Sequence, residues 1–193
     1  MDQKLVFIGN SIVNGFPFPR SGCFVSLIRQ ATGWDVINKG NNGETTTDIL
    51  QRFDRDVIAH HPDLVCILTG TNDFIYRQAS PRQAFENLER MVEKAAKAQP
   101  EAIRPVLLTP LLVDVPMATR LWRPESGIDY EAVNQDLEAI ACLIRSSGID
   151  YVDLTTAWQD CRLYHDGVHP LPEGHRFIAD KILDFFMVSR QVD

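Results

Sequence analysis

The sequence predicts an α/β protein in which a parallel sheet lies between two layers of helices. Short apolar runs alternate with longer segments of helical periodicity, and this β-α pattern repeats five times along the chain. The apolar runs are nearly continuous, as in strands that are covered on both faces. Right-handed crossovers then build a three-layer α/β/α sandwich around a five-stranded parallel sheet. Doubly wound sheets of this size favour the flavodoxin-like strand order 2-1-3-4-5.

The predicted strands and helices follow one another in regular order. The strands cover residues 4–8, 35–38, 63–69, 105–109 and 150–153, and the helices cover residues 22–32, 46–60, 81–98, 129–147 and 172–188. Gly33 and Gly148 stand where two helices should end, and Ser80 followed by Pro81 is typical of a helix start. The last two helices each show one apolar face, formed by Val133, Leu137, Ile140 and Ile144 and by Ile178, Ile182, Phe185 and Phe186.

Length and composition indicate one domain over residues 1–193. The chain has 193 residues, of which 45% are hydrophobic, so it can bury a core without disulfides or a structural metal. Its net charge of -7 and the lack of a long basic run argue against a nucleic-acid partner and a stable membrane attachment. The four cysteines have no C-x-x-C spacing and are expected as reduced thiols, mostly in the core. No apolar run has the length of a signal peptide or a spanning helix, so we expect a cytoplasmic protein.

The loop after the first predicted strand places a serine between glycines. Gly9 and Gly15 flank Ser11, which allows a tight turn that exposes the hydroxyl and the neighbouring backbone N–H. A serine that caps the first helix, or a small phosphate-binding turn of flavodoxin type, would have the same pattern. This loop alone therefore does not separate catalysis from binding.

Three further loops carry polar groups at strand ends. Gly43 precedes a helix N-terminus, where N–H groups favour developing negative charge, although a glycine turn before a threonine cap explains it equally well. Asn72 can donate amide hydrogens to an oxyanion or form an Asx-turn. Asp166 lies three residues before His169, so its carboxylate can orient the imidazole and stabilise the protonated ring.

In combination and in this order, the loops closely resemble those of the SGNH hydrolases, the superfamily of GDSL-type esterases and lipases. The resemblance consists of four blocks, each after a predicted strand or near the end of the chain. The blocks are a serine block (Gly9, Ser11, Gly15), a glycine block (Asn38, Gly40, Gly43), a G-x-N-D block (Gly70, Asn72, Asp73) and a D-x-x-H block (Asp166, His169). Together they span nearly the whole chain.

The resemblance implies acyl transfer without a cofactor or a metal ion. Ser11 would attack the carbonyl carbon of an ester or thioester, His169 would act as general base and then acid, and Asp166 would orient His169. The backbone N–H groups of Ser11 and Gly43 and the side-chain amide of Asn72 would form the oxyanion hole.

One position departs from the family pattern, because Asn10 stands where an aspartate is usual. The exchange removes a negative charge beside Ser11 but leaves the nucleophile and its base in place. The expected partner is a small-molecule ester, and the aromatic and arginine-bearing loops near the motifs predict the walls of its pocket. The candidate substrate-binding residues are Phe16, Phe18, Phe74, Trp122 and Arg123.

Several alternatives to a general carboxylic-ester hydrolase stay open. Thioesterases, lysophospholipases and carbohydrate O-acetyl esterases of the same superfamily differ in the shape of the pocket. A non-catalytic flavodoxin-like module that binds phosphate would use the same loops, but it leaves Asp166 and His169 without a role. A metal site on His165 and His169 is not expected, because Gly167 lies between them and interrupts a helix. We expect His175 at the surface or at the entrance of the site.

Overall fold

The computed structural model describes residues 3–123, 126–158 and 160–189, and its strands form one parallel sheet. The strands are β1 (Lys4–Gly9), β2 (Asp35–Gly40), β3 (Leu64–Leu68), β4 (Arg104–Leu108) and β5 (Tyr151–Val152). Their order is β2-β1-β3-β4-β5, which confirms the predicted doubly wound topology. Gly9 of β1 lies in register with Gly40 of β2 and Leu68 of β3, so these three strands end together.

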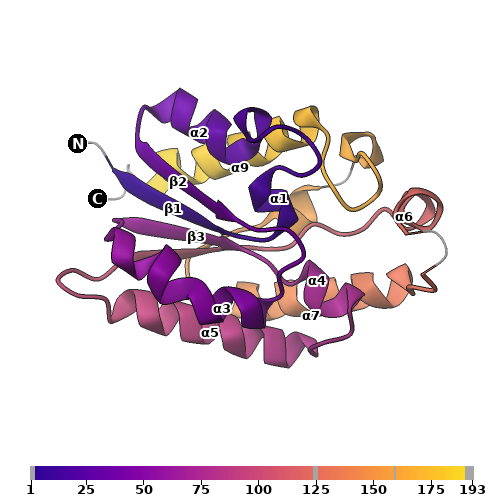
Figure 1. Cartoon of the computed structure of the whole chain (residues 1–193), viewed down its shortest axis with the longest axis horizontal. Coiled ribbons are helices and arrows are strands. Elements are labelled where there is room, and N and C mark those ends of the chain that lie inside the picture. Colours follow the sequence, from indigo (N-terminus) through magenta and orange to yellow (C-terminus); the bar gives the residue numbers. More distant parts are fainter. Residues whose placement is uncertain (1–2, 124–125, 159, 190–193) are drawn as a thin grey trace.

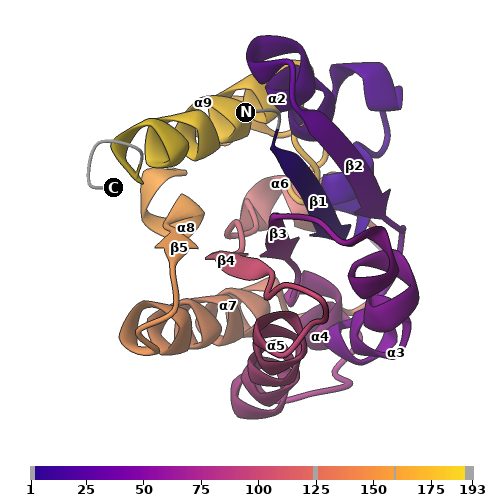
Figure 2. The ribbon, with the colours of Figure 1, turned by 90° about the vertical axis from the view of Figure 1, so that its left-hand side faces the viewer.

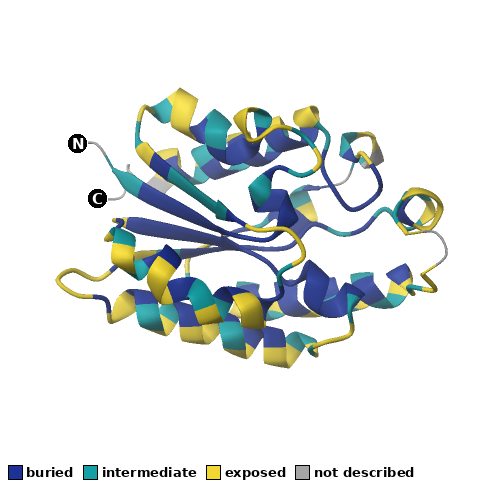
Figure 3. Ribbon diagram, in the orientation of Figure 1, coloured by how far each residue is buried: buried dark blue, intermediate teal, exposed yellow. Residues whose placement is uncertain are grey.

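Helices cover both faces of this sheet (Figures 1 and 2). On one face α2 (Phe24–Thr32) packs against α9 (Pro172–Ser189), and on the other α5 (Pro81–Ala96) packs between α3 (Thr46–Asp56) and α7 (Tyr130–Ser146). Alternate residues of β1 enter the two cores: Val6 on the side of α3, α5 and α7, and Phe7 on the side of α2 and α9. The central strands are therefore apolar at successive positions: β3 is buried along its whole length, and β1 is buried from Leu5 to Gly9 (Figure 3).

The structure corrects several predicted boundaries. The strand predicted over residues 150–153 has only two residues, and the one predicted over 63–69 is shorter by one residue at each end. The helix predicted over 46–60 ends at Asp56, because the backbone of Val57 (φ −123, ψ −65) leaves the helical region before a 3-10 turn at Ile58–His60. The structure also contains short helices that were not predicted, namely α1 (Ser11–Asn14), α4 (Thr71–Ile75), α6 (Val115–Leu121) and α8 (Leu154–Ala157).

The helices described above include none with the length and apolar character that crossing a membrane requires. The cytoplasmic location and the single domain over residues 1–193 stay predictions. Cys23 and Cys66 are free and buried, as expected for core thiols, whereas Cys142 is free and exposed.

His175 lies in the hydrophobic core, which corrects the expectation that it lies at the surface. Its ring stacks on Phe24 at a centroid distance of 6.1 Å, and neither ring nitrogen has a hydrogen-bond partner among the described residues. Burial, with a smaller contribution from the charge of His169, lowers the pKa of His175 to about 4. His175 precedes Ile178 by three residues and so belongs to the apolar face of α9 that the sequence already shows.

Gly40 permits the close approach of α1 to the end of β2. A Cβ atom at this position would lie 2.1 Å from the backbone nitrogen of Asn14 and 2.6 Å from the carbonyl carbon of Val13. The Asn38 side chain donates a hydrogen bond to the Val13 carbonyl oxygen at 2.7 Å and ties the two elements together at the same point. Glycine is therefore required here, because a Cβ atom would overlap backbone atoms rather than the end of a flexible side chain.

Replacing His175 with Phe should reduce the loss of stability on acidification. Because the folded protein disfavours the charged imidazole, the unfolded chain binds more protons below its ordinary pKa, and stability falls between pH 6.5 and about pH 4. At about 1.4 kcal/mol per pKa unit, His175 can contribute up to about 3 kcal/mol of that loss. Urea unfolding at several pH values measures it, with His165→Phe as the control at an exposed imidazole. Equal pH dependence in wild type and His175→Phe would contradict the burial argument.

Replacing Gly40 with Ala should destabilise the fold by at least about 2 kcal/mol, in the range of overpacked sites. The added methyl group must push α1 away from β2, since its contacts are backbone atoms. Gly22→Ala is the matched control, because a Cβ atom at Gly22 has no neighbour within 4 Å. Urea unfolding of both variants tests the difference, and equal stability of the two would refute the role given to Gly40.

Candidate active site

The four sequence blocks come together at the carboxyl ends of the strands. The first lies at the junction of β1 and α1, the second covers the end of β2 and the loop that leads to α3, and the third lies at the junction of β3 and α4. Figure 1 shows α1, α4 and α6 at the end of the sheet toward which the arrows point. The fourth block lies in the loop before α9. Open parallel sheets bind ligands at this edge.

Ser11 begins helix α1 directly after β1. Asn10 is the N-cap residue, and its side-chain oxygen accepts a hydrogen bond from the Ile12 backbone N–H at 3.3 Å. The Ser11 Oγ lies 3.0 Å from His169 Nε2, and both side chains are buried. The cap thus sets where the helix starts, and the start of the helix directs the serine toward the histidine.

Asp166 holds His169 in place through both of its carboxylate oxygens. Oδ2 lies 2.8 Å from His169 Nδ1, and Oδ1 accepts the backbone N–H groups of Val168 at 2.9 Å and His169 at 2.7 Å. Burial acts to raise the pKa of Asp166, but the hydrogen bonds and charge of His169, with the backbone N–H groups, hold that pKa below its ordinary value. An ionised Asp166 sets the ring so that Nε2 faces Ser11.

The connection before α7 supports this histidine loop. The Asp114 backbone N–H donates to the Gly167 carbonyl at 2.9 Å, and a Cβ atom at Gly167 (φ 90) would lie 2.4 Å from the Ala118 nitrogen. The close packing of α6 on the loop also brings Trp122 to His169, with ring centroids 4.6 Å apart. Helix α6 therefore supports the loop that carries the histidine, and Trp122, its C-cap residue, forms one wall of the site.

The three groups predicted as oxyanion donors lie around one cavity. Gly43 has a left-handed backbone (φ 79), and the Asn72 side-chain amide donates to the Glu44 carbonyl oxygen at 2.9 Å. That bond uses one of the two amide hydrogens of Asn72. The other is available to a ligand between Ser11 and Gly43, which line the same cavity.

Asp73 anchors the loop that carries Gly43. It is fully buried, and its carboxylate accepts the backbone N–H of Thr46 at 2.9 Å and the Thr46 hydroxyl at 2.6 Å. Burial raises the pKa of Asp73, although the hydrogen bonds from Thr46 oppose the rise. The third sequence block thus positions the second: Asn72 holds the Glu44 carbonyl, and Asp73 holds the start of α3.

The cavity in front of Ser11 has a volume of about 180 Å³. It is lined by Ser11, Phe16, Asn42, Gly43, Asn72, Tyr76, Trp122, Arg123, Val168 and His169. Phe16 contacts the His169 ring at a centroid distance of 4.9 Å. The Arg123 guanidinium lies over the rings of Tyr76 and Trp122, at 5.6 and 5.4 Å from their centroids. Three of the predicted substrate residues, Phe16, Trp122 and Arg123, therefore face this cavity.

Phe18 and Phe74, which were also predicted to bind substrate, do not line it. Phe18 packs on the exposed His165, with ring centroids 5.4 Å apart. Phe74 lies in the core on the side of α3, α5 and α7, because two residues along a helix from Asn72 the side chain points to nearly the opposite face. Sequence analysis missed Asn42 and Tyr76, although Asn42 belongs to the recognised glycine loop and Tyr76 directly follows α4.

The described residues contain no cluster of three or more His, Cys, Asp or Glu side chains placed to hold a metal ion. His165 is exposed and packs on Phe18, while His169 is engaged by Ser11 and Asp166. The arrangement can instead move a proton from a hydroxyl to an imidazole beside an ionised carboxylate.

A serine, a histidine and an aspartate in hydrogen-bond contact at the edge of a parallel sheet define the architecture of a serine hydrolase. The GDSL-like Lipase/Acylhydrolase family matches residues 7–177 of the sequence. The chain belongs to this family of esterases and acylhydrolases.

Individual relatives agree with this assignment. An arylesterase from Vibrio mimicus is 25% identical over 183 residues, covering 92% of this chain and 85% of that protein. An acetylxylan esterase from Geobacillus stearothermophilus is 28% identical over 205 residues, covering 94% of this chain and 92% of that protein. The crystal structure of the lipase/acylhydrolase from Enterococcus faecalis superposes with a TM-score of 0.75 at 26% identity and covers 94% of each chain.

Replacing Asp166 with Asn should lower ester turnover by about 10⁴, as the same exchange does in a serine-protease triad. The amide cannot stabilise the protonated imidazole and favours the wrong tautomer of His169. Asp180→Asn, on the exposed face of α9, is the matched control and should keep wild-type turnover. The measurement is kcat on p-nitrophenyl acetate with circular dichroism as a check of folding. A folded Asp166→Asn variant with wild-type kcat would show that Asp166 has no part in the reaction.

Proposed function

We propose that this protein hydrolyses carboxylic esters with short acyl groups through an acyl-enzyme on Ser11. The observation that carries the proposal is the continuous line of hydrogen-bond contacts from Ser11 Oγ to His169 Nε2, at 3.0 Å, and from His169 Nδ1 to Asp166 Oδ2, at 2.8 Å. A hydroxyl becomes a nucleophile when a base accepts its proton as it attacks, and this line supplies the base and its orienting carboxylate.

In the first half of the reaction Ser11 Oγ bonds to the carbonyl carbon while its proton passes to His169 Nε2. The carbonyl oxygen takes the negative charge and is held by the N–H groups of Ser11 and Gly43 and the amide of Asn72. When the tetrahedral intermediate collapses, the bond to the leaving alcohol breaks and His169 returns the proton to it. Water then attacks the acyl carbon while His169 accepts its proton. When this second intermediate collapses, the bond to Ser11 Oγ breaks, His169 returns the proton to Ser11, and the carboxylic acid leaves.

The size of the cavity supports short acyl groups. A cavity of roughly 150 Å³ is enough for a molecule the size of benzene, so the volume of about 180 Å³ suits a small acyl group or one aryl ring. A long chain, such as that of a lysophospholipid, would extend beyond it. Phe16 and Trp122 supply apolar walls beside His169, and these walls favour an uncharged acyl group over a charged one.

A second candidate is the O-deacetylation of a carbohydrate. Polar and aromatic groups share the mouth of the cavity: Asn42, Tyr76 and Arg123 all line it. The Asn42 side-chain oxygen accepts from the Asn14 amide at 2.8 Å, so its own NH₂ group is available to a hydroxyl of the leaving alcohol. One of the relatives is named an acetylxylan esterase, which agrees with a small acyl group on a polar alcohol.

Replacing Ser11 with Ala should abolish both turnover of p-nitrophenyl acetate and covalent labelling by a fluorophosphonate probe, because both require the Ser11 alkoxide. Ser21→Ala is the matched control, since Ser21 is exposed and does not line the cavity. Labelling retained in Ser11→Ala would assign the nucleophile elsewhere. A wild-type protein that is folded but neither labelled nor active would favour the non-catalytic binding module.

The same assay separates the two candidate substrate classes. Wild-type kcat/KM is measured on acetyl to decanoyl esters, on an acetylated sugar and on a lysophospholipid. A maximum at short chains supports the proposed pocket, and a further preference for the sugar identifies carbohydrate deacetylation. A maximum at decanoyl or on the lysophospholipid would contradict the short-acyl proposal.

A further inference from the structure

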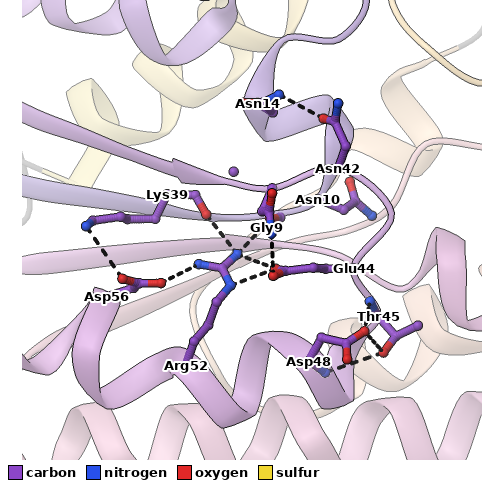
Figure 4. Close-up of polar contacts among 12 residues, drawn as sticks. Gly9, Asn10, Asn14, Lys39, Asn42, Glu44, Thr45, Asp48, Arg52 and Asp56 are labelled. Atoms are coloured by element: carbon purple, nitrogen blue, oxygen red, sulfur yellow. Dashed lines mark hydrogen bonds and ion pairs between the residues drawn. The ribbon is translucent and has the colours of Figure 1, made fainter.

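Arg52 of α3 makes polar contacts with three other segments beneath the candidate active site and with Asp56 of its own helix (Figure 4). Its Nε donates to Glu44 Oε2 at 2.6 Å, and its Nη1 donates to Asp56 Oδ2 at 2.9 Å. Its Nη2 donates to two backbone carbonyls, Gly9 O at 3.1 Å and Lys39 O at 2.9 Å. The side chain is only 10% exposed, so the guanidinium is largely shielded from water.

Three of these partners, Gly9, Lys39 and Glu44, lie on segments that carry or contact the candidate oxyanion donors, whereas Asp56 lies on α3 with Arg52. Gly9 ends β1 and lies two residues before Ser11, and Glu44 directly follows Gly43. The Glu44 carbonyl oxygen accepts the Asn72 amide at 2.9 Å, which connects the third donor to the same guanidinium. Lys39 precedes Gly40, on which α1 packs. One planar cation thus connects the segments that hold all three donors.

The geometry of guanidinium suits this connecting role better than that of any other side chain. Its N–H groups point in set directions within one plane, so the acceptors that they bind are held at set relative positions. Glu44 and Asp56 neutralise its charge, and Asn41 donates to the second Glu44 oxygen at 2.7 Å. The loop around Gly43 is exposed, and among the described residues Arg52 is the cation that ties it to the sheet.

We propose that Arg52 is a positioning residue that sets the spacing of the Ser11, Gly43 and Asn72 donors around the reacting oxygen. This inference rests on the proposed ester hydrolysis. Oxyanion donors act only if they lie at about 2.7–3.1 Å from the oxygen that becomes charged, and sites that are loose by about 1 Å lose much of their activity. Arg52 touches no substrate; it acts through Gly9, Glu44 and Asn72.

The test is Arg52→Met, which keeps the apolar stem and removes every donor, compared with Arg55→Met. Arg55 also pairs with Asp56, at 2.8 Å, but its side chain is 74% exposed and it is not in contact with the Gly43 loop. We expect kcat on p-nitrophenyl acetate to fall about tenfold to a hundredfold in Arg52→Met, with KM nearly unchanged, and to stay at the wild-type value in Arg55→Met.

A second readout separates positioning from a general loss of structure. A trifluoromethyl ketone forms a hemiketal with the serine whose oxygen occupies the oxyanion hole. The affinity for this ketone should fall in Arg52→Met by the same factor as kcat/KM. A merely structural role would lower the unfolding midpoint without changing the affinity for the ketone relative to that for the substrate. Wild-type kcat in folded Arg52→Met, or a change confined to KM, would overturn the proposal.

Glu44→Ala keeps the test decisive if Arg52→Met does not fold. It removes the side-chain bond between the Gly43 loop and Arg52 while the two contacts with strand carbonyls stay intact. The same pattern of lower kcat and weaker ketone binding is expected, and wild-type behaviour would overturn the proposal. If the wild type hydrolyses no ester, or Ser11→Ala keeps its activity, then the proposed function fails instead, and these controls report that outcome separately.

Discussion

The hydrogen bond between Ser11 and His169 joins positions 158 residues apart in the sequence, and the rest of the site is arranged around it. It requires β1 to lie inside the sheet, so that Ser11 emerges at the edge where the other strands also end. It also requires the last loop to return across that edge, which α6 secures by packing on Gly167. Sheet order and one tight turn therefore place the proposed nucleophile beside its proposed base before any substrate is present.

Buried charge at this edge of the sheet is neutralised or hydrogen-bonded within the loops themselves. Asp166 is held by His169 and two backbone N–H groups, Asp73 by Thr46, and Arg52 by Glu44 and Asp56. An unpaired group of this kind would destabilise the fold, so each pairing also restrains the loop that supplies the partner. The same bonds that satisfy these charges thus hold the proposed catalytic groups at their distances.

The sequence predicts the sheet well, since apolar runs such as that around Val65, bounded by turn residues, are typical of a strand that is covered on both faces. It does not predict α1 or α4, because helices of one turn show no periodicity. It brings Ser11 and His169 together only through the family resemblance. The sequence does not predict the role of Arg52, because an arginine on an amphipathic helix usually faces solvent. It also does not predict that Phe74 points into the core, because the direction of this side chain depends on where α4 begins.

Asn10 shows which part of the family pattern the geometry needs. Its buried side chain caps α1 through an oxygen that accepts the Ile12 N–H, and this requires a lone pair rather than a charge. An aspartate would supply the same acceptor together with a negative charge at the residue before Ser11. The neutral amide keeps the start of the helix at Ser11 without that charge, so loss of the charge is compatible with the intact Ser11, His169 and Asp166 arrangement.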